Sequence, residues 1–241
     1  MVVHNVCTAI VFLAQIQKMY SLKYRVTTSC CGTNGRLKLY SALQMMQDCS
    51  EMWIESEPSI QECFSCRHMA QLLASRQVEV VRTPRFGERL TVSTSVYEVK
   101  PMFGYRNTFI YDADGKPCYR TWSQGVFVDT QTGKLTKIPD SDIATVHLDA
   151  KLPMNYQDRR IVVPKDAIGI CLPCISVQRN DIDYNQHVNN ANYVRIALEL
   201  LPNDFEVGGL RVEYKVPAKA GSALTPVIVD AGQRIFVTLH I

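Results

Sequence analysis

The sequence lacks the features that mark several large classes of protein. Its formal net charge is only +3 over 241 residues, which is too small to indicate binding to nucleic acid. An apolar run at residues 8–14 is too short to span a bilayer and has no basic leader, so we expect no membrane insertion. No phosphate-binding loop, dinucleotide fingerprint or low-complexity segment occurs, and we therefore expect no cofactor.

The composition is that of an ordinary globular protein. Hydrophobic residues make up 46% and charged residues 20%, enough for a sizeable core. Nine cysteines without a secretion signal indicate reduced thiols and a cytoplasmic location. The pairs Cys63/Cys66 and Cys171/Cys174 have CxxC spacing, but they lie far apart and no further ligand pattern accompanies them. We interpret them as ordinary thiols and expect no metal site.

A repeat divides the chain. The segments "VEVVRTPRFGERLT" (residues 78–91) and "VEYKVPAKAGSALT" (residues 212–225) share one frame, in which Arg85 matches Lys219 and Gly87 matches Gly221. Each predicts a strand, a turn centred on glycine and a second strand.

A helix is expected upstream of each repeat. Residues 37–54 have apolar side chains at helical spacing, and so do residues 192–201, where Asn189 or Asn190 can cap the start and Pro202 stops the helix. Alternating polarity and turn motifs then predict an antiparallel meander with strands at residues 78–83, 89–99, 105–113 and 118–128.

Four segments follow from this pattern. Residues 1–18 are interpreted as a leader or, preferably, as a mis-called start before Met19. Residues 19–137 form a first module, residues 138–170 a connector, and residues 171–241 a second module. The second module stops in or just after an alternating strand, so we expect it to be truncated or to lack its last strand.

The stretch "DIDYNQHVNN" (residues 181–190) carries the candidate chemistry. If it is extended, the side chains of Asp183, Asn185 and His187 point to one side. A histidine titrates near neutrality and can act as general base on a water, while an amide N–H can polarise a carbonyl. The free N–H groups of the following helix favour a developing negative charge. Asparagine and aspartate before a helix are also ordinary caps and turns, which is the competing interpretation.

In this setting "DIDYNQHVNNANYV" resembles the active-site signature of acyl-ACP thioesterases, which hydrolyse fatty acyl groups from acyl carrier protein (ACP). The first module resembles them in "GRLKLYSALQMMQD" and "DGKPCYRTWSQGVFVDTQTGKL". The resemblance runs from about residue 20 to the end. It implies an α+β fold of two tandem hotdog modules, each a long apolar helix wrapped by a curved antiparallel sheet.

The resemblance also implies residue roles. His187 is the expected general base, and Asp183 and Asn185 orient the water and the carbonyl. The expected substrate contacts are Met46, Trp53, Asn189, Asn190 and Tyr193. Matching residues 33–38 to 185–190 places Thr33 opposite Asn185, Gly35 opposite His187 and Cys31 opposite Asp183. None of the three functional groups is repeated. We therefore expect one active site, with the first module supplying the walls of the acyl pocket.

One departure from the family pattern is visible. The family has a glutamate three residues after the tyrosine of an "EY" strand, followed in some plant members by a cysteine, where this chain has Pro217 and Ala218. Glu213 lies on the same strand face if that strand is regular, but it is about 13 Å away along the strand. Asp183 is therefore the better surviving carboxylate.

Several functions stay open at this stage. An acyl-ACP thioesterase needs a basic surface for its acidic partner, and the candidates are Arg85, Arg89, Lys215 and Lys219. The alternatives are an acyl-CoA thioesterase, a catalytically degenerate acyl-binding protein and, with less support, a dehydratase. Two fused modules are compatible with a monomer or a homodimer.

Overall fold

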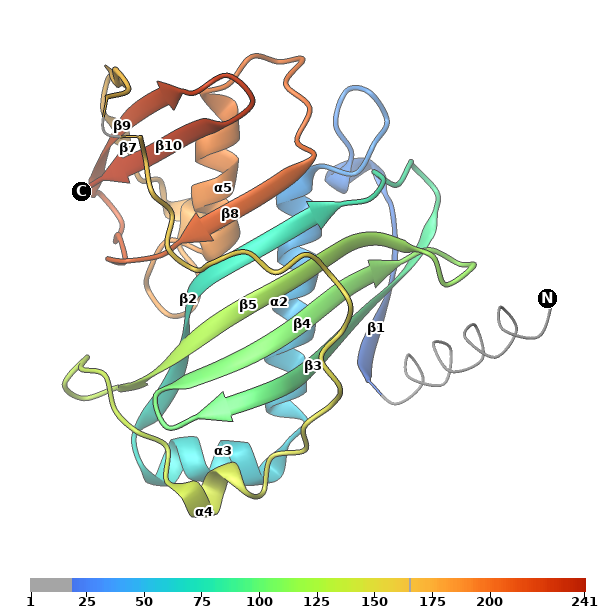
Figure 1. Cartoon of the computed structure of the whole chain (residues 1–241), viewed down its shortest axis with the longest axis vertical. Coiled ribbons are helices and arrows are strands. Elements are labelled where there is room, and N and C mark those ends of the chain that lie inside the picture. The colour runs from blue at the N-terminus through green and yellow to red at the C-terminus, as the bar shows by residue number, and fades with distance from the viewer. Residues whose placement is uncertain (1–18, 165) are drawn as a thin grey trace. The chain divides into compact units, whose positions relative to one another are not determined.

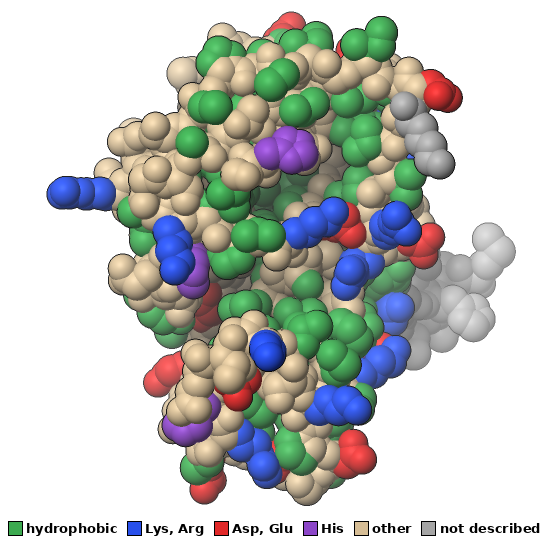
Figure 2. Space-filling model, turned by 90° about the vertical axis from the view of Figure 1, so that its left-hand side faces the viewer, with side chains coloured by type: hydrophobic (Ala, Val, Ile, Leu, Met, Phe, Trp, Pro, Cys, Tyr) green, Lys and Arg blue, Asp and Glu red, His purple; other side chains and the backbone are tan. Residues whose placement is uncertain are grey.

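The computed structural model describes residues 19–164 and 166–241 (Figure 1). The interpretation of residues 1–18 therefore lies outside the described residues. Contacts divide the chain into an N-terminal unit, Met1–Gln157 with Val207–Arg211, and a C-terminal unit, Asp158–Glu206 with Val212–Ile241. On the face drawn in Figure 2, basic side chains are interspersed with acidic and hydrophobic ones, in keeping with the small net charge.

A long helix forms the centre of the N-terminal unit. Helix α2 spans Leu39–Glu55, close to the predicted residues 37–54. Its buried side chains recur at helical spacing and include Ala42, Leu43, Met46 and Cys49, none more than 1% exposed. Two shorter helices, α3 (Pro58–Cys66) and α4 (Asp140–Ile143), were not expected from the sequence. Proline at the first position of α3 is the signal that was available for that helix.

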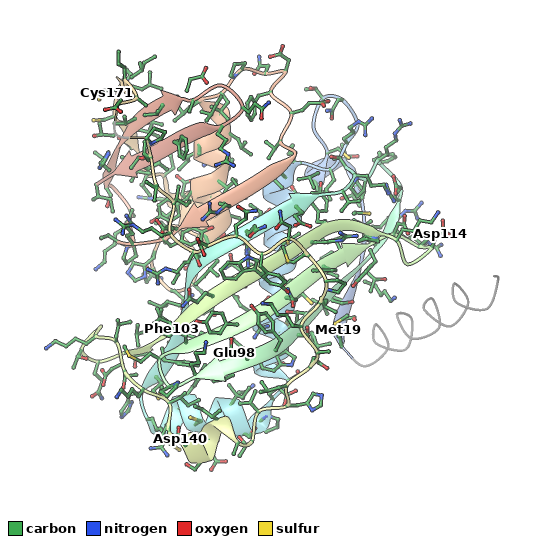
Figure 3. The ribbon with its side chains drawn as sticks, viewed as in Figure 1. Met19, Glu98, Phe103, Asp114, Asp140 and Cys171 are labelled. Carbon is green, nitrogen blue, oxygen red and sulfur yellow. The ribbon has the colours of Figure 1, made fainter. Side chains whose placement is uncertain are left out.

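An antiparallel sheet packs against α2. Its strands are β1 (Tyr20–Arg25), β2 (Met69–Val80), β3 (Arg89–Lys100), β4 (Phe103–Tyr111) and β5 (Pro117–Asp129), in the order β1-β3-β4-β5-β2, and β8 (Gly209–Glu213) follows β2. Figure 3 labels Glu98 and Phe103, which lie where β3 passes into β4. The four predicted strands are present, and β3, β4 and β5 form a meander. The prediction is wrong for β2, which pairs with β5 at the far side of the meander rather than with β3. Strand β2 also begins nine residues earlier than expected, at Met69 rather than Val78.

The two faces of this sheet are covered differently. Toward α2, the hydroxyl of Thr108 lies 3.4 Å from that of Ser50. On the opposite face, the side chain of Asn107 accepts a hydrogen bond from the backbone of Leu152 at 3.0 Å and donates one to the hydroxyl of Tyr156 at 2.9 Å. Residues of the predicted connector therefore cover the outer face.

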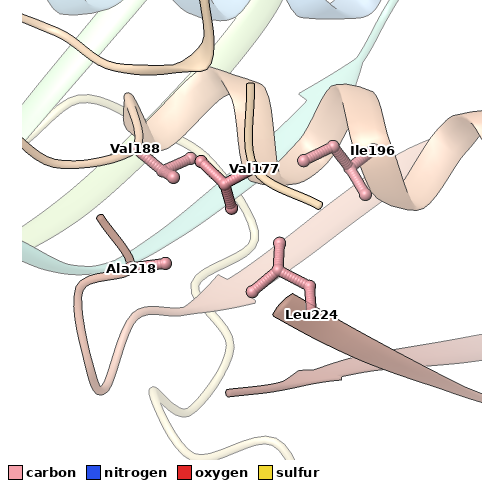
Figure 4. Close-up of a cluster of buried hydrophobic side chains, with 5 residues drawn as sticks. All are labelled: Val177, Val188, Ile196, Ala218 and Leu224. Carbon is pink, nitrogen blue, oxygen red and sulfur yellow. The ribbon is translucent and has the colours of Figure 1, made fainter. Parts of the chain in front are cut away.

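The C-terminal unit is smaller and follows the same plan. Its elements are β6 (Ile170–Cys171), β7 (Ile175–Ser176), α5 (Asn190–Glu199), β9 (Ala223–Asp230) and β10 (Ile235–His240). Strand β9 pairs with β10 on one side and with β6 and β7 on the other. The core gathers five buried side chains from turn, helix and sheet (Figure 4): Val177, Val188, Ile196, Ala218 and Leu224.

The repeat is confirmed in the backbone. Gly87 N–H donates to the carbonyl of Val26 at 2.8 Å, and Gly221 N–H donates to the carbonyl of Val177 at 3.3 Å. Both glycines have positive φ, 88° and 79°, which a residue with a Cβ rarely adopts. The strand bounds agree as well, because β3 begins at Arg89 and β9 at its counterpart Ala223, while β8 ends at Glu213, one position short of the counterpart of Val80, where β2 ends. In both repeats the first strand ends earlier than expected.

Candidate active site

The segment before α5 is a tight turn. Ile182 bridges to Val188, Asp183 N–H donates to the carbonyl of His187 at 2.9 Å, and Gln186 N–H donates to the carbonyl of Asp183 at 3.0 Å. Gln186 has a φ of 63°, in the left-handed region. The condition of an extended segment is therefore not met, because local hydrogen bonds close the chain on itself.

The closed turn gives its polar side chains different tasks. The carboxylate of Asp183 accepts the backbone N–H of Asn185 at 2.9 Å, so it stabilises the turn from within. The side chain of Asn185 is exposed and that of His187 is half-buried. No described residue hydrogen-bonds to the Asn185 carboxamide or the His187 imidazole. An amide donor and an imidazole are thus both available to a ligand on one turn.

The helix that follows is capped as predicted. The side-chain oxygen of Asn189 accepts the N–H of Ala191 at 2.9 Å. The backbone carbonyl of Asp181 accepts the N–H of Asn189 at 2.8 Å and the side chain of Asn192 at 2.9 Å. These bonds fix the segment before α5 to the first turn of the helix, so the backbone that carries its exposed side chains is held in place.

An ion cluster beneath the turn was missed by sequence reasoning. Asp181 is 5% exposed, and its carboxylate accepts the N–H of Gln178 at 2.7 Å and the guanidinium of Arg195 at 2.6 Å. Arg195 also binds Glu199, four residues later on α5, at 2.8 Å. The Arg195/Glu199 spacing was the available signal, whereas the contact with Asp181 depends on how the turn closes.

Two tyrosines line the start of α5. The Tyr193 hydroxyl accepts the backbone N–H of Ala218 at 2.7 Å, and burial raises the pKa of that hydroxyl. The Tyr214 hydroxyl donates to the carbonyl of Asn190 at 3.2 Å, and the two rings lie 6.1 Å apart. Ala218, at one of the two departures from the family pattern, is 1% exposed. Its backbone N–H binds Tyr193 of α5, and its carbonyl accepts the N–H of Val188 in the turn at 2.9 Å.

The remaining two predicted substrate contacts belong to the N-terminal unit. Met46 is fully buried where α2 packs on the sheet. Trp53 is half-buried, and the guanidinium of Arg106 lies 4.4 Å from the centre of its ring. Their contact with substrate stays a prediction. Glu213 ends β8, so the regular strand that would place it on the same face as residue 217 does not exist.

The expected internal alignment is wrong by one residue. The bridge Cys31–Leu37 is the counterpart of Ile182–Val188, and Gly35 (φ 68°) is the counterpart of Gln186. The structural partners are therefore Gly32 with Asp183, Asn34 with Asn185, and Arg36 with His187. The asparagine is repeated, while the carboxylate and the imidazole occur in the C-terminal unit alone among these paired positions.

Neither a cluster of metal-ligating side chains nor a membrane-spanning helix occurs among the described residues. In the described ranges, no group of three or more His, Cys, Asp or Glu side chains is placed to hold a metal ion. Helices long and apolar enough to cross a membrane are also not found there.

Comparison with known proteins decides the family. The acyl-ACP thioesterase N-terminal domain model matches residues 17–146, and the C-terminal domain model matches residues 173–240. The chain belongs to the acyl-ACP thioesterase family. Its turn and α5 lie within the part that matches the family's C-terminal domain.

Individual relatives agree with this family. A chloroplastic acyl-[acyl-carrier-protein] hydrolase of Cuphea viscosissima is 30% identical over 173 residues, which cover 67% of this chain and 41% of that relative. The chain thus spans about two fifths of the length of the curated relatives it matches first.

Two solved structures share the fold. An acyl-ACP thioesterase from Bacteroides thetaiotaomicron has a TM-score of 0.80 at 19% identity, with 94% of each chain covered. The 12:0-ACP thioesterase from Umbellularia californica has a TM-score of 0.78 at 20% identity, with 92% of each chain covered. The predicted α+β fold of tandem hotdog modules is confirmed.

Proposed function

We propose that the chain hydrolyses the thioester of fatty acyl-ACP and releases the free fatty acid. The observation that supports this most is the turn before α5. It leaves an imidazole and a carboxamide unused by other described residues in the part of the chain that matches the family's C-terminal domain.

The proposed mechanism assigns one task to each group. His187 takes a proton from water as the water attacks the thioester carbonyl. As the C–S bond then breaks, the imidazolium returns this proton to the leaving sulfur, so that the fatty acid and the free thiol of the carrier are released. Asn185 donates its amide N–H to the carbonyl oxygen, where negative charge develops. Asp183 acts as a positioning residue, because its carboxylate accepts the N–H of Asn185 within the turn.

Asn189, Asn190 and Tyr193 are the proposed substrate contacts next to this turn. All three lie at the start of α5, and the caps and hydroxyl contacts described above hold them in place. Met46 and Trp53 would contact the acyl chain in the N-terminal unit. Pro217 leaves the family's carboxylate position empty, so we expect turnover to depend on His187 and on the turn alone.

Acyl carrier protein is the proposed partner. Its acidic surface calls for basic side chains, and Arg85, Arg89, Lys215 and Lys219 are all exposed. Arg85 and Lys219 occupy matching positions in the two glycine turns, which gives two equivalent places to test.

The first experiment measures hydrolysis of acyl-ACPs from short to long chains by the wild type, His187→Ala and Arg36→Ala. Arg36 is the structural counterpart of His187 in the N-terminal unit and serves as the matched control. We expect His187→Ala to lose at least about 10²-fold in turnover and Arg36→Ala to keep it.

Each other result has a meaning. Equal turnover in the wild type and His187→Ala would move the active site elsewhere. A folded wild type that binds acyl-ACP without hydrolysing it would be an acyl-binding protein. Faster turnover of acyl-CoA than of acyl-ACP would identify the chain as an acyl-CoA thioesterase.

A further inference from the structure

A charged side chain lies inside the N-terminal unit without an acidic partner among the described residues. Arg106 on β4 is 7% exposed. Its Nη1 donates to the backbone carbonyl of Ser50 at 3.1 Å and to the hydroxyl of Thr94 at 3.3 Å, and its guanidinium stacks on Trp53. Among residues 19–164 and 166–241, no carboxylate pairs with it. Buried charges are normally paired, so this one needs an explanation.

The unused edge of the guanidinium has a defined shape. An arginine carries five N–H donors in a planar fork, and the two contacts above use Nη1 only. The Nε–Nη2 edge makes no hydrogen bond within the described part of the chain. Two parallel donors at such an edge match the two oxygens of a carboxylate. Burial lowers the pKa of Arg106 to about 10, with Arg76 adding to the effect, and the group is still charged at neutral pH.

The surroundings of Arg106 are polar as well. Ser123 on β5 lies directly opposite it in register and is 6% exposed. The hydroxyls of Thr94 and Thr108 lie 2.9 Å apart on the same face of the sheet. A hydrocarbon chain forms no hydrogen bonds with these hydroxyl groups. This part of the interior therefore suits a ligand that carries oxygen.

A second polar group lies on the same face. Gly104 and Gly125 are paired in register two residues before Arg106 and two residues after Ser123. The side chain of Gln71 covers both glycines, and a Cβ on Gly125 would approach its Cγ to 2.7 Å. The Gln71 amide forms no hydrogen bond with a described residue. A further donor is thus available on the same face of the sheet as Arg106, at a place where two strands carry no side chains.

We propose that the N-terminal unit binds a carboxylate at the distal end of the acyl chain, with the Nε–Nη2 edge of Arg106 as the anchor and the Gln71 amide as a further donor on the same face of the sheet. The proposal rests on the proposed function, because that function assigns the N-terminal interior to the acyl chain. The substrate class is then an acyl thioester with a second, terminal carboxylate.

The competing explanation is structural. Arg106 joins Ser50 and Trp53 of α2 to Thr94 of the sheet, and bracing is a sufficient task for a buried arginine. A bracing role predicts that Arg106 variants lose stability while the choice between substrates does not change.

The test compares two acyl-ACPs of equal chain length, one ending in a methyl group and one in a carboxylate. The readout is kcat/KM for the carboxylate-ended substrate divided by kcat/KM for the methyl-ended substrate. This ratio is measured in the wild type, Arg106→Gln, Arg106→Lys and Gly125→Ala. We expect the wild type to favour the carboxylate and Arg106→Gln to reduce the ratio about 10- to 100-fold. Arg106→Lys keeps the charge but loses the fork, and we expect it to reduce the ratio less.

Gly125→Ala displaces Gln71 without changing Arg106, so we expect a smaller loss in the same direction. Gly208→Ala is the matched control, because a Cβ there meets no atom within 4 Å. It should keep the wild-type ratio. Thermal melting of each variant identifies any that fail to fold, and Gly125→Ala keeps the test valid if both arginine variants do.

The result that overturns the proposal is a wild type that hydrolyses the methyl-ended substrate but not the carboxylate, or a ratio that Arg106→Gln leaves unchanged. Either result leaves the thioesterase proposal intact. If neither substrate is hydrolysed, calorimetric titration with the free dicarboxylic and monocarboxylic acids decides. Preferential, Arg106-dependent binding of the dicarboxylic acid supports the site although the proposed function fails, and equal binding overturns the site.

Discussion

The turn before α2 and the turn before α5 have the same backbone but different side-chain support. Gly32 N–H donates to the carbonyl of Arg36 at 2.8 Å, as Asp183 N–H donates to that of His187 at 2.9 Å. In the first turn, the side chain of Asn34 accepts the N–H of Arg36 at 3.0 Å. A duplicated backbone has therefore kept its own hydrogen bonds while the side chains changed tasks.

The change of task frees one group. In the second turn, Asp183 supplies the stabilising oxygen, at a position where the first turn has Gly32. Asn185, the counterpart of Asn34, is then not needed by the turn. The comparison teaches that a carboxylate within the turn leaves a neighbouring amide free. Under the proposed function, Asp183 would in this way support catalysis indirectly.

The ion clusters of the two units also differ in place. In the N-terminal unit, Arg82 binds Glu88 at 2.7 Å and Asp112 at 2.8 Å near the glycine turn. Val216 and Ser222 stand at the positions of Arg82 and Glu88 in the C-terminal unit. There the cluster of Asp181, Arg195 and Glu199 lies instead at the turn before α5. Each unit thus reinforces a different junction.

The largest expected effect separates the two asparagines. Asn185→Ala removes the proposed carbonyl donor and should reduce kcat about 10²-fold. Asn34→Ala should leave kcat unchanged and lose only a turn contact. Steady-state hydrolysis of acyl-ACP measures both, and equal losses in the two variants would refute the assignment of different tasks.

The next effect tests the cluster beneath the turn. Arg195→Met leaves the carboxylate of Asp181 buried without its cation, which should cost about 2 kcal/mol of unfolding free energy, less than for a fully buried pair because Arg195 is 30% exposed. Gln44→Met changes the counterpart position, where no ion pair is present, and should be nearly neutral. Urea denaturation of both variants checks this. A neutral Arg195→Met would show that the cluster does not stabilise the turn.

The N-terminal cluster should respond to pH. Arg82 lowers the pKa of Glu88 below its ordinary 4.5, and at Asp112 the bonds from Arg82 and Lys116 outweigh the opposing effect of burial. A lowered folded-state pKa stabilises the fold above the unfolded value, and that stabilisation is lost as the pH falls below about 4.5. Arg82→Met should cost about 1 kcal/mol at pH 7, discounted because the arginine is 38% exposed.

The measurement is the melting temperature of the wild type and Arg82→Met between pH 7 and pH 3. The difference between them should shrink as the pH falls through this window. A difference that stays constant would mean that the cluster contributes by packing rather than by charge.

The smallest effect concerns the left-handed residue of each turn. Gln186→Gly relieves a positive φ and should raise stability by up to about 1 kcal/mol, whereas Gly35→Ala introduces the same strain and should lower it by a similar amount. Thermal melting measures both. Effects of the same sign would contradict the correspondence between the turns.

The sequence predicted those elements in which local pattern and long-range packing agree. Helix α2 and the strands of the meander follow from apolar periodicity, and the Asn189 cap follows from its position before α5. Placing Asp183, Asn185 and His187 on one side assumed an extended segment, whereas residues 182–188 form a turn. The internal alignment slipped by one residue for the same reason, since the matching loop bridges are not visible in the residue pattern.

The sequence by itself determined the family, the repeat, and the two helices and the meander, because periodic burial and the order of polar groups are written along the chain. Only the tertiary structure decided which of those polar groups are left free. It paired Asp183 with the backbone of Asn185, placed Arg195 on Asp181, and buried Arg106 against α2 with no acidic partner in the described part of the chain. The physical reason is that a hydrogen bond depends on where the folded backbone brings its partner, and residues distant in sequence give no sign of that meeting.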